Sequence, residues 1–303
     1  MSDEIFSEVI VRLPAENSLL LVQALDQGGA LPELSGYYET LYQEDRPADD
    51  QTQLSLFFPV SFELPEIQVE LLLVALGIDR YAIESQRVQR QDYLEAYKEH
   101  YQPFHLTRRI FITPSWERGG QAEQQARCSG SIPLYLDPGL AFGTGKHPTT
   151  QLCAACIEEL TGPGIRFIDA GAGSGILSLV ALLLGAEAGL AFDIDGNAAL
   201  SIRQNLEANC PPLQSEQLQI VCGDFTSSAF ENFSADWLFA NITAAGILQN
   251  IDAIERGSFS RMMLSGILSE KAEQVLQAFQ SNWRSLDARH LDGWSLLLLE
   301  RRS

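Results

Sequence analysis

Ile165-Arg-Phe-Ile-Asp169-Ala-Gly171-Ala-Gly173-Ser-Gly175 is the stretch that decides the fold of this 303-residue chain. A short apolar run leads into three glycines at alternate positions, which predicts a β-strand, a tight turn and the start of a helix. Glycines in such a turn let the backbone approach a ligand closely. Asp193-Ile-Asp195 ends the next apolar run, 22 residues after Gly171, at the position of a ribose-binding carboxylate. The two sites together predict a cofactor that contains a nucleoside.

The spacing of the glycines distinguishes two classes of cofactor. A dinucleotide fingerprint reads G-x-G-x-x-G, and its third glycine allows a helix to pack closely on a strand. Counted from Gly171, that third position is the branched Ile176, which opposes binding of NAD. The spacing D-x-G-x-G-x-G instead resembles motif I of S-adenosylmethionine (SAM) methyltransferases. We therefore expect SAM as the cofactor, and the residues of this turn expected to bind it are Asp169, Gly171, Gly173 and Gly175.

The composition indicates a globular chain with a large excess of acid. Apolar residues make up 46% of the sequence, and 40 acidic against 20 basic side chains give a net charge of −20 at pH 7. Residues 1–100 are especially acidic, with 19 acids and 6 bases. This excess either keeps the chain soluble or attracts a basic partner. It argues against a nucleic-acid partner, because affinity for phosphates comes largely from Lys and Arg.

The amino-terminal sequence lacks the basic region and the long apolar core of a signal peptide. The apolar runs Leu19–Val22 and Leu296–Leu299 are too short to span a bilayer. We therefore expect no membrane partner and a cytoplasmic location.

The five cysteines and four histidines do not form a complete metal site. Cys153-x-x-Cys156 has the spacing of a redox or zinc motif, but it lies in the helical-looking segment 152–160. No second cysteine pair and no nearby histidine completes a set of ligands. We therefore expect no metal and interpret the cysteines as small buried residues.

The first 88 residues predict a small recognition domain with the element order β-α-β-β-α-β. This order is ferredoxin-like and is typical of binding modules. The expected strands are 8–13, 36–42, 54–60 and 81–88, and the expected helices are 18–27 and 65–76. An interdomain linker helix is expected over residues 89–105, with a stripe of tyrosines at positions 93, 97 and 101.

The remaining domain, residues 106–303, predicts an α/β fold with a doubly wound, mostly parallel sheet. Strands are expected near 165–169, 188–193, 217–222, 235–240 and 260–265. Helices are expected near 150–160, 176–184, 197–209, 245–255 and 268–280. Two earlier strands are expected at 109–116 and 131–136, and a final antiparallel pair at 281–287 and 294–301. A terminal hairpin on a parallel sheet resembles the seven-stranded, Rossmann-like sheet of class I SAM methyltransferases.

The most specific stretch is Asp137-Pro-Gly-Leu-Ala-Phe142-Gly-Thr-Gly-Lys-His147-Pro-Thr149-Thr150, a glycine-rich loop that leads into a helix. Exposed N–H groups at a helix start favour a carboxylate, such as that of the methionine part of SAM. The alternative interpretation is an ordinary capped helix. The stretch resembles the hallmark of the PrmA family of ribosomal protein methyltransferases. Further stretches agree with this family: Ile112–Trp116, Asp169–Gly175, Ala240–Ile242 and Leu264–Leu268.

The resemblance covers residues 90–303 well, and covers the first 88 residues only in their element order, which is that of the family's substrate-recognition domain. It implies a SAM-dependent enzyme that methylates lysine ε-amines and an N-terminal α-amine of ribosomal protein L11 of the large subunit. The residues that it places at the cofactor or at the methyl-transfer site are Thr150, Gly171, Asp193 and Asn241, with Phe142 and Thr149 close by. Asp224 stands where the family contacts the adenine end.

Asn241 is the expected catalytic residue, because methyl transfer mainly requires an amine held in line with the methyl group. A lysine, with a pKa of about 10.4 in water, must first lose a proton. Burial beside a positive sulfonium lowers that pKa, so no strong dedicated base is required. The Asn241 side chain can accept a hydrogen bond from the amine and aim its lone pair. The alternative is that Asn241 caps the following helix.

The sequence leaves several functions open besides methylation of L11. Enzymes that methylate nucleobases usually follow this Asn or Asp with Pro-Pro and a stacking aromatic residue, whereas this chain has Asn241-Ile-Thr-Ala-Ala, which argues against them. The chain could instead be a lysine methyltransferase with another protein target. The best argument for this alternative is the sequence of the first 88 residues, which matches the family only in element order, and Thr243 and Gly246 also depart from the residues usual in the family. The chain could also be a SAM-binding protein without activity or an NAD-dependent oxidoreductase.

Overall fold

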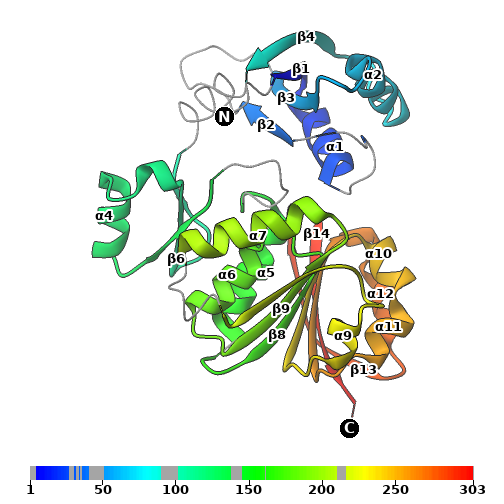
Figure 1. Cartoon of the computed structure of the whole chain (residues 1–303). Helices are drawn as coiled ribbons and strands as arrows, with labels where there is room; N and C mark the ends of the chain where they lie inside the picture. Colours follow the sequence, from blue (N-terminus) through cyan, green and yellow to red (C-terminus); the bar gives the residue numbers. More distant parts are fainter. Residues whose placement is uncertain are drawn as a thin grey trace. The chain divides into compact units, whose positions relative to one another are not determined.

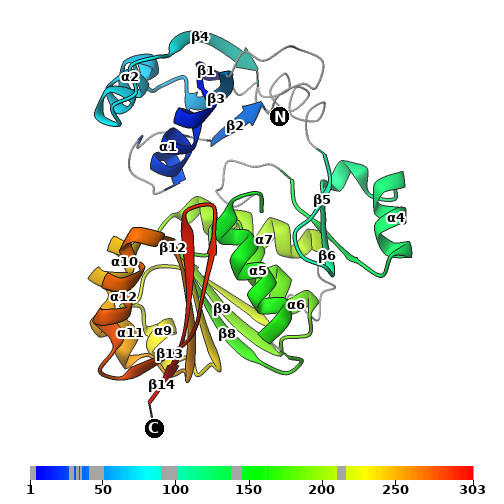
Figure 2. The ribbon, with the colours of Figure 1, turned by 180° about the vertical axis from the view of Figure 1, so that it is seen from behind.

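The structure is a computed structural model, and it describes residues 5–26, 31, 34, 36–40, 51–89, 102–137, 145–160, 162–209 and 216–302. The chain divides into two compact units, Met1–Gln102 and Pro103–Ser303 (Figures 1 and 2). Among the described residues, no helix is long and apolar enough to cross a bilayer.

The first unit has the expected β-α-β-β-α-β order. Its elements are β1 (Ile5–Pro14), α1 (Ala15–Asp26), β2 (Gly36–Thr40), β3 (Gln51–Pro59), α2 (Pro65–Ala75) and β4 (Ala82–Gln89). The strands form a sheet in the order β2-β3-β1-β4, and all neighbouring strands are antiparallel. The ferredoxin-like arrangement expected from the sequence is therefore confirmed.

One face of this sheet carries both helices. Val9 pairs with Leu56 and Val11 with Leu54, so their side chains share a face, because side chains along a strand alternate between the two faces. Leu21 of α1 and the residues Val69 and Leu73 of α2 belong to the same buried cluster. The first unit therefore has its own apolar core.

The second unit begins with a small sheet and continues with a large one. Its strands are β5 (Phe104–His105), β6 (Ile110–Thr113), β7 (Ile132–Tyr135), β8 (Arg166–Ala170), β9 (Ala188–Asp193), β10 (Leu218–Cys222), β11 (Trp237–Asn241), β12 (Arg261–Leu268), β13 (Trp283–Leu291) and β14 (Trp294–Arg301). Its helices are η1 (Ser115–Glu117), α4 (Gln121–Cys128), α5 (Pro148–Leu160), α6 (Ile176–Leu183), α7 (Gly196–Asn209), α9 (Ser228–Asn232), α10 (Ala244–Gln249), α11 (Ile251–Arg256), η2 (Ser269–Lys271) and α12 (Ala272–Phe279).

The large sheet has seven strands in the order β10-β9-β8-β11-β12-β14-β13. The first five strands of this order are parallel, and β14 runs antiparallel to both of its neighbours. Figures 1 and 2 show α5, α6 and α7 on one face, and α10, α11 and α12 on the other. The expected doubly wound sheet with a terminal hairpin is confirmed.

The order of the strands positions the candidate site. From β8 the chain first builds outward through β9 and β10, and then crosses to β11 on the other side of β8. Ligands of open α/β sheets bind outside the carboxyl ends of the strands at such a switch point. The segments that follow Ala170, Asp193, Cys222 and Asn241 all leave this edge.

Some elements differ from the expectations. α4 was not predicted because it is a polar helix, in which only Glu123 and Ala126 are buried, and it shows no apolar period. The helix expected over 245–255 is two short helices that meet at Asn250. The helix expected over 89–105 is wrong at both of its ends, since Gln89 belongs to β4 and Phe104–His105 is a strand. Residues 90–101, with the tyrosine stripe, lie outside the described residues.

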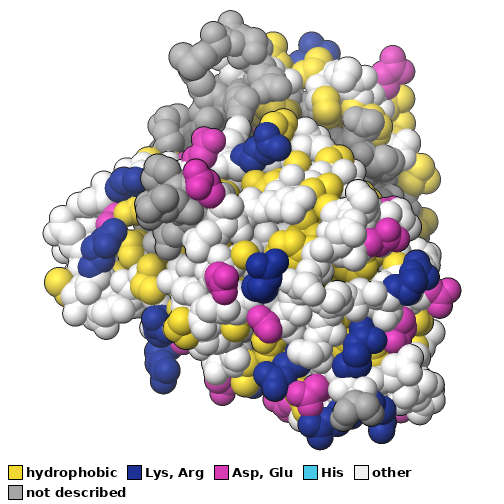
Figure 3. All heavy atoms as spheres, turned by 60° about the horizontal axis from the view of Figure 1, so that its bottom comes forward, with side chains coloured by type: hydrophobic (Ala, Val, Ile, Leu, Met, Phe, Trp, Pro, Cys, Tyr) yellow, Lys and Arg dark blue, Asp and Glu magenta, His cyan; other side chains and the backbone are white. Residues whose placement is uncertain are grey.

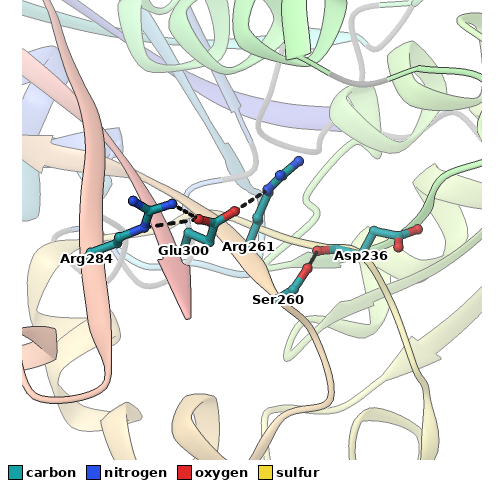
Figure 4. A network of polar contacts seen from close by, with 5 residues as sticks. All are labelled: Asp236, Ser260, Arg261, Arg284 and Glu300. Carbon is teal, nitrogen blue, oxygen red and sulfur yellow. Dashed lines mark hydrogen bonds and ion pairs between the residues drawn. The ribbon is translucent and has the colours of Figure 1, made fainter. Parts of the chain in front are cut away.

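Charged side chains connect the three strands at one edge of the large sheet (Figure 4). Glu300 of β14 accepts hydrogen bonds from Arg261 of β12, at 3.0 Å, and from Arg284 of β13. These two guanidinium groups lower the pKa of Glu300, with Arg284 the larger cause. Because the arginine side chains are exposed, the network adds little stability. Its main effect is to place opposite charges next to each other on neighbouring strands.

A substitution at Gly189 tests the packing between β9 and β8. Gly189 lies in β9 opposite Phe167, and a Cβ atom at position 189 would lie 2.3 Å from the Phe167 ring. We expect Gly189→Ala to lower the free energy of unfolding by about 1–3 kcal/mol, because the buried ring has to move. Urea unfolding measures this change. Gly196→Ala is the control, since a Cβ there meets nothing within 4 Å. Equal midpoints for the two variants would contradict the packing argument.

Candidate active site

The glycine-rich turn leaves β8 in the conformation that its sequence requires. Gly171, Gly173 and Gly175 have φ angles of 68°, 54° and 78°, in the left-handed region that favours glycine. A Cβ atom at Gly171 would lie 2.3 Å from Cγ2 of Ile242. The Gly171 N–H donates to the Phe192 carbonyl oxygen at 2.9 Å, which ties the turn to β9. The sequence interpretation of a tight strand-to-helix turn is therefore confirmed.

Asp169 lies directly before this turn and is buried, with 1% of its surface exposed. Its Oδ2 accepts hydrogen bonds from the Ser178 backbone N–H at 3.0 Å and the Ser178 hydroxyl at 2.7 Å. Burial raises the pKa of Asp169 to about 6, against the lowering effect of the Ser178 bonds, and the nearby Asp193 raises it further. This carboxyl group connects the end of β8 to the first turn of α6.

Asp193 ends β9 and contacts the glycine turn directly. Its Oδ2 accepts from the Gly173 N–H at 2.9 Å, and its Oδ1 accepts from the Asp195 N–H at 3.0 Å. Each carboxylate oxygen has a further lone pair, so both can still accept a bond from a ribose hydroxyl. The structure thus brings together two sites that lie 22 residues apart in the sequence, Gly171 and Asp193.

Asp224 follows β10 and lies at the same edge of the sheet. The Gly223 N–H donates to the Asp193 carbonyl oxygen at 2.8 Å, which places Asp224 beside the end of β9. Its Oδ1 accepts from the Thr226 hydroxyl at 2.6 Å and the Thr226 N–H at 2.8 Å. These bonds lower the pKa of Asp224, which is therefore a carboxylate at neutral pH.

The start of α5 carries Thr149 and Thr150, which are both buried. The Thr149 N–H points at His147 Nδ1 at 3.3 Å, so this ring nitrogen is an acceptor. The Thr149 hydroxyl lies 2.7 Å from the same ring nitrogen. The His147 ring packs edge-on against Trp294 of β14, with centroids 4.9 Å apart. Phe142, the remaining expected site residue of this stretch, lies outside the described residues.

Asn241 is the last residue of β11 and holds an unusual polar atom. Its Oδ1 is buried and has no hydrogen-bond partner among the residues that the structure describes, although most buried polar atoms in proteins have one. The following helix, α10, is capped instead by Thr243, whose hydroxyl accepts from the Gly246 N–H at 3.1 Å. The alternative interpretation of Asn241 as a helix cap is therefore wrong, and its side-chain oxygen stays available to a donor from a ligand.

Comparisons with known proteins agree with this geometry. The family model described as ribosomal protein L11 methyltransferase (PrmA) matches residues 7–302. The ribosomal protein L11 methyltransferase of Leptospira interrogans is 31% identical in an alignment 306 residues long, which covers 98% of this chain and 99% of that protein. That of Streptococcus pyogenes is 29% identical over 300 residues, covering 94% and 91%.

The chain belongs to the PrmA family.

A solved structure supports the assignment at the level of the fold. The ribosomal protein L11 methylase of Lactobacillus delbrueckii subsp. bulgaricus superposes with a TM-score of 0.59 and 26% identity, over 67% of this chain and all of that chain. This PrmA family member is therefore a protein methyltransferase, and membership of the family implies SAM as its methyl donor. The expectation of a methyltransferase rather than an NAD-dependent oxidoreductase is confirmed.

Ile242 packs against the glycine turn of the candidate site, and the sequence analysis gave it no role. Its side chain occupies the space that Gly171 leaves open, and its carbonyl oxygen would lie 2.4 Å from a Cβ atom at Gly266. Gly266 has a φ angle of 77° and stands in the family-like stretch Leu264–Leu268. That glycine, beside a predicted strand end, was the available signal for a close backbone contact.

The cysteines only partly match their predicted role. Cys153 and Cys156 are buried in α5, as expected, and burial raises the pKa of both thiols. Cys128 and Cys222 are exposed, so the interpretation of the cysteines as buried residues is wrong for these two. Cys210 lies outside the described residues. Within the described part of the chain, no group of three or more His, Cys, Asp or Glu side chains could hold a metal ion.

The buried Asp169 gives a pH-dependent stability that can be measured. Its pKa is about 6 in the folded protein, whereas an ordinary aspartate has a pKa of 3.8. The folded state therefore holds the proton more tightly than the unfolded state does. The contribution of Asp169 to the free energy of unfolding is then greatest below about pH 4, and it is lost as the pH rises through about 6. Because Asn can accept the same bonds from Ser178 without a charge, we expect Asp169→Asn to stabilise the protein at pH 7.5, by up to about 3 kcal/mol.

Chemical unfolding of wild type and Asp169→Asn between pH 4 and pH 8 measures this effect. The gain should shrink toward zero at pH 4. Asp252→Asn, which removes an exposed carboxylate from α11, is the control and should change stability only slightly. A difference between wild type and Asp169→Asn that stays constant across this pH range would contradict the assignment.

Proposed function

We propose that this methyltransferase binds SAM at the carboxyl edge of β8, β9, β10 and β11, and methylates amines of ribosomal protein L11. The target amines are lysine ε-amines, the N-terminal α-amine, or both. The proposal is supported by the family membership, by the names of the relatives and by the geometry of the edge. The observation that carries it is the buried Oδ1 of Asn241 beside the glycine turn, which has no hydrogen-bond partner within the described part of the chain.

The residues at this edge match the chemical groups of SAM. In the proposed complex the carboxylate of Asp193 accepts the ribose hydroxyls, and Asp224 lies toward the adenine end. The buried start of α5, with Thr149 and Thr150, faces the methionine carboxylate, because helix N-termini favour anions. Phe142 is proposed to lie nearby. Gly171, Gly173 and Gly175 keep side chains out of the space, while Asp169 ties the turn to α6.

The proposed reaction needs little beyond orientation and desolvation. Bound SAM supplies a methyl group on a positively charged sulfur atom. Asn241 Oδ1 accepts a hydrogen bond from the substrate amine and thereby aims its lone pair. Before that step the ammonium form loses its proton to water, which burial beside a positive charge favours. Because an amide cannot take up the proton, Asn241 acts by positioning the amine.

The departures at Thr243 and Gly246 have a structural explanation that leaves the reaction unaffected. Thr243 supplies the cap of α10, and Gly246 donates the N–H that the cap requires. Both residues therefore keep β11 and α10 connected at the end that holds Asn241. This role removes one of the two arguments for a different protein target; the other was the weak match of the first 88 residues to the family.

The remaining parts of the proposal concern partners and location. We propose that the ferredoxin-like unit recognises the protein substrate, and that the enzyme acts in the cytoplasm without binding nucleic acid. In Figure 3, Lys and Arg side chains are interspersed with Asp and Glu over the described surface in view, and no continuous basic tract gathers there. The net charge of −20 is unfavourable for binding phosphates.

Intact-mass spectrometry of purified L11 incubated with the enzyme and SAM tests the proposal. We expect mass increments of one or more methyl groups with wild type, and turnover reduced on the order of 100-fold with Asn241→Ala. Binding of S-adenosylhomocysteine, measured by calorimetry, should change little, because the variant mainly loses the contact to the amine. Asn232→Ala removes an exposed asparagine of α9 and serves as the control.

Three outcomes would count against parts of the proposal. If L11 remains unmodified while S-adenosylhomocysteine binds, the enzyme acts on another protein. If neither activity nor binding is found, the chain keeps the fold without the function. Full turnover by Asn241→Ala would remove Asn241 from the methyl-transfer step.

A further inference from the structure

The outer surface of α2 carries a row of large apolar side chains. Leu64, Ile67, Leu71 and Val74 are 57%, 44%, 58% and 63% exposed. Ile67, Leu71 and Val74 are spaced four and three residues apart, which places them on one face of the helix, and Leu64 directly precedes the helix at its N-terminal end. We call this set the α2 stripe. Single exposed apolar residues are ordinary, but a contiguous row of four marks an interaction surface.

The α2 stripe is not part of the core of its unit. The buried residues of the helix, Pro65, Val69 and Leu73, point toward the sheet and lie on the opposite side of the helix from the stripe. A surface helix of a globular domain normally has one apolar face and one polar face. Since the core already occupies one face of α2, folding of the first unit does not account for the second.

The charges around the α2 stripe have one sign. α2 contains Glu66 and Glu70 and no basic residue, and Glu63 directly precedes its cap. Glu70 is held in place by the Tyr81 hydroxyl, which donates to it at 3.1 Å. The described base nearest in sequence after the helix is Arg80, which lies beyond its end. The stripe is thus apolar with an acidic margin, which fits a partner that has apolar side chains among basic ones.

Leu64 adds a conformational observation. It caps α2 with φ 54° and ψ 52°, in the left-handed region that bulky residues rarely adopt. Its side chain is nevertheless 57% exposed, so burial within the described unit does not compensate the strain. Strained residues concentrate at binding surfaces, where a partner uses the conformation.

We propose that the α2 stripe is the surface on which the basic protein substrate docks. This inference rests on the proposed function, because it identifies where the substrate of the same enzyme binds. Apolar contact supplies the affinity, and Glu63, Glu66 and Glu70 orient the substrate and speed its encounter.

Steady-state methylation by the full-length enzyme tests the docking surface. The double variant Leu71→Gln, Val74→Gln keeps helix-forming residues and removes half of the apolar stripe. We expect its KM for full-length L11 to rise at least about 10-fold, which corresponds to about 1.4 kcal/mol of binding. The kcat, the KM for SAM and the activity on a short lysine peptide should stay at wild-type values, since the peptide has no docking surface. Leu200→Gln is the matched control, because Leu200 is 59% exposed on α7.

Charge reversal provides a second, independent readout. Glu63→Lys with Glu66→Lys should raise the KM for L11 at low salt, and the increase should diminish at high salt, on the order of 0.5 M NaCl, because salt screens exposed charges. A change in the thermal transition is not expected for either double variant. The two variants together separate apolar contact from electrostatic attraction.

The results of these measurements support or overturn the proposal. An unchanged KM for L11 in the Gln variant, with an active wild type, overturns the docking surface and leaves the proposed function intact. A wild-type dimer that the Gln variant converts to monomer, with L11 methylation unaffected, assigns the stripe to a second copy of the chain instead. If wild type does not methylate L11, the proposed function fails, and the docking proposal fails with it.

Discussion

Ile242 fills the space that two glycines leave open at the carboxyl edge of the large sheet, and the candidate site depends on this contact. Gly171 follows β8 and Gly266 lies in β12, so the two strands that flank β11 both yield space to the residue that follows β11. Neither glycine could carry a side chain without moving the Ile242 side chain or backbone. The packing of Ile242 therefore fixes the position of Asn241, the residue before it. Because Thr243 caps α10, the Asn241 side chain does not have to do so.

The same edge concentrates acidic groups that serve different purposes. Asp169 is buried and bonded to Ser178, and burial raises its pKa to about 6. Asp193 bonds to backbone N–H groups and keeps lone pairs for a ligand. Asp224 is exposed and is stabilised as a carboxylate by Thr226. Three carboxyl groups of similar sequence context thus differ because burial and hydrogen bonding differ.

The sequence predicted the fold wherever the apolar pattern was strong. All strands of the large sheet and the ferredoxin-like order of the first unit were expected, because buried parallel strands and amphipathic helices have distinctive patterns. α4 was missed since its polar sequence has no such pattern, and its start is held by Glu123, which accepts from the Gly119 N–H. The break at Asn250 was missed because apolar residues continue on both sides of it.

The candidate site could also be predicted only in part. Glycines and carboxylates at strand ends could be placed from their spacing alone. Ile242 could not, because an isoleucine after a strand resembles any core residue until the glycines opposite it are known.

The α2 stripe shows why the expected helix alone was not sufficient. Its apolar residues were present in the sequence, but the division into a face toward Val69 and Leu73 and a face toward solvent needed the structure. An apolar helix is usually assigned to a core, and here only half of it belongs there. Under the two proposals, catalysis and substrate capture have separate requirements. The edge of the large sheet needs glycines and buried polar atoms, whereas α2 needs exposed apolar side chains with acidic residues around them.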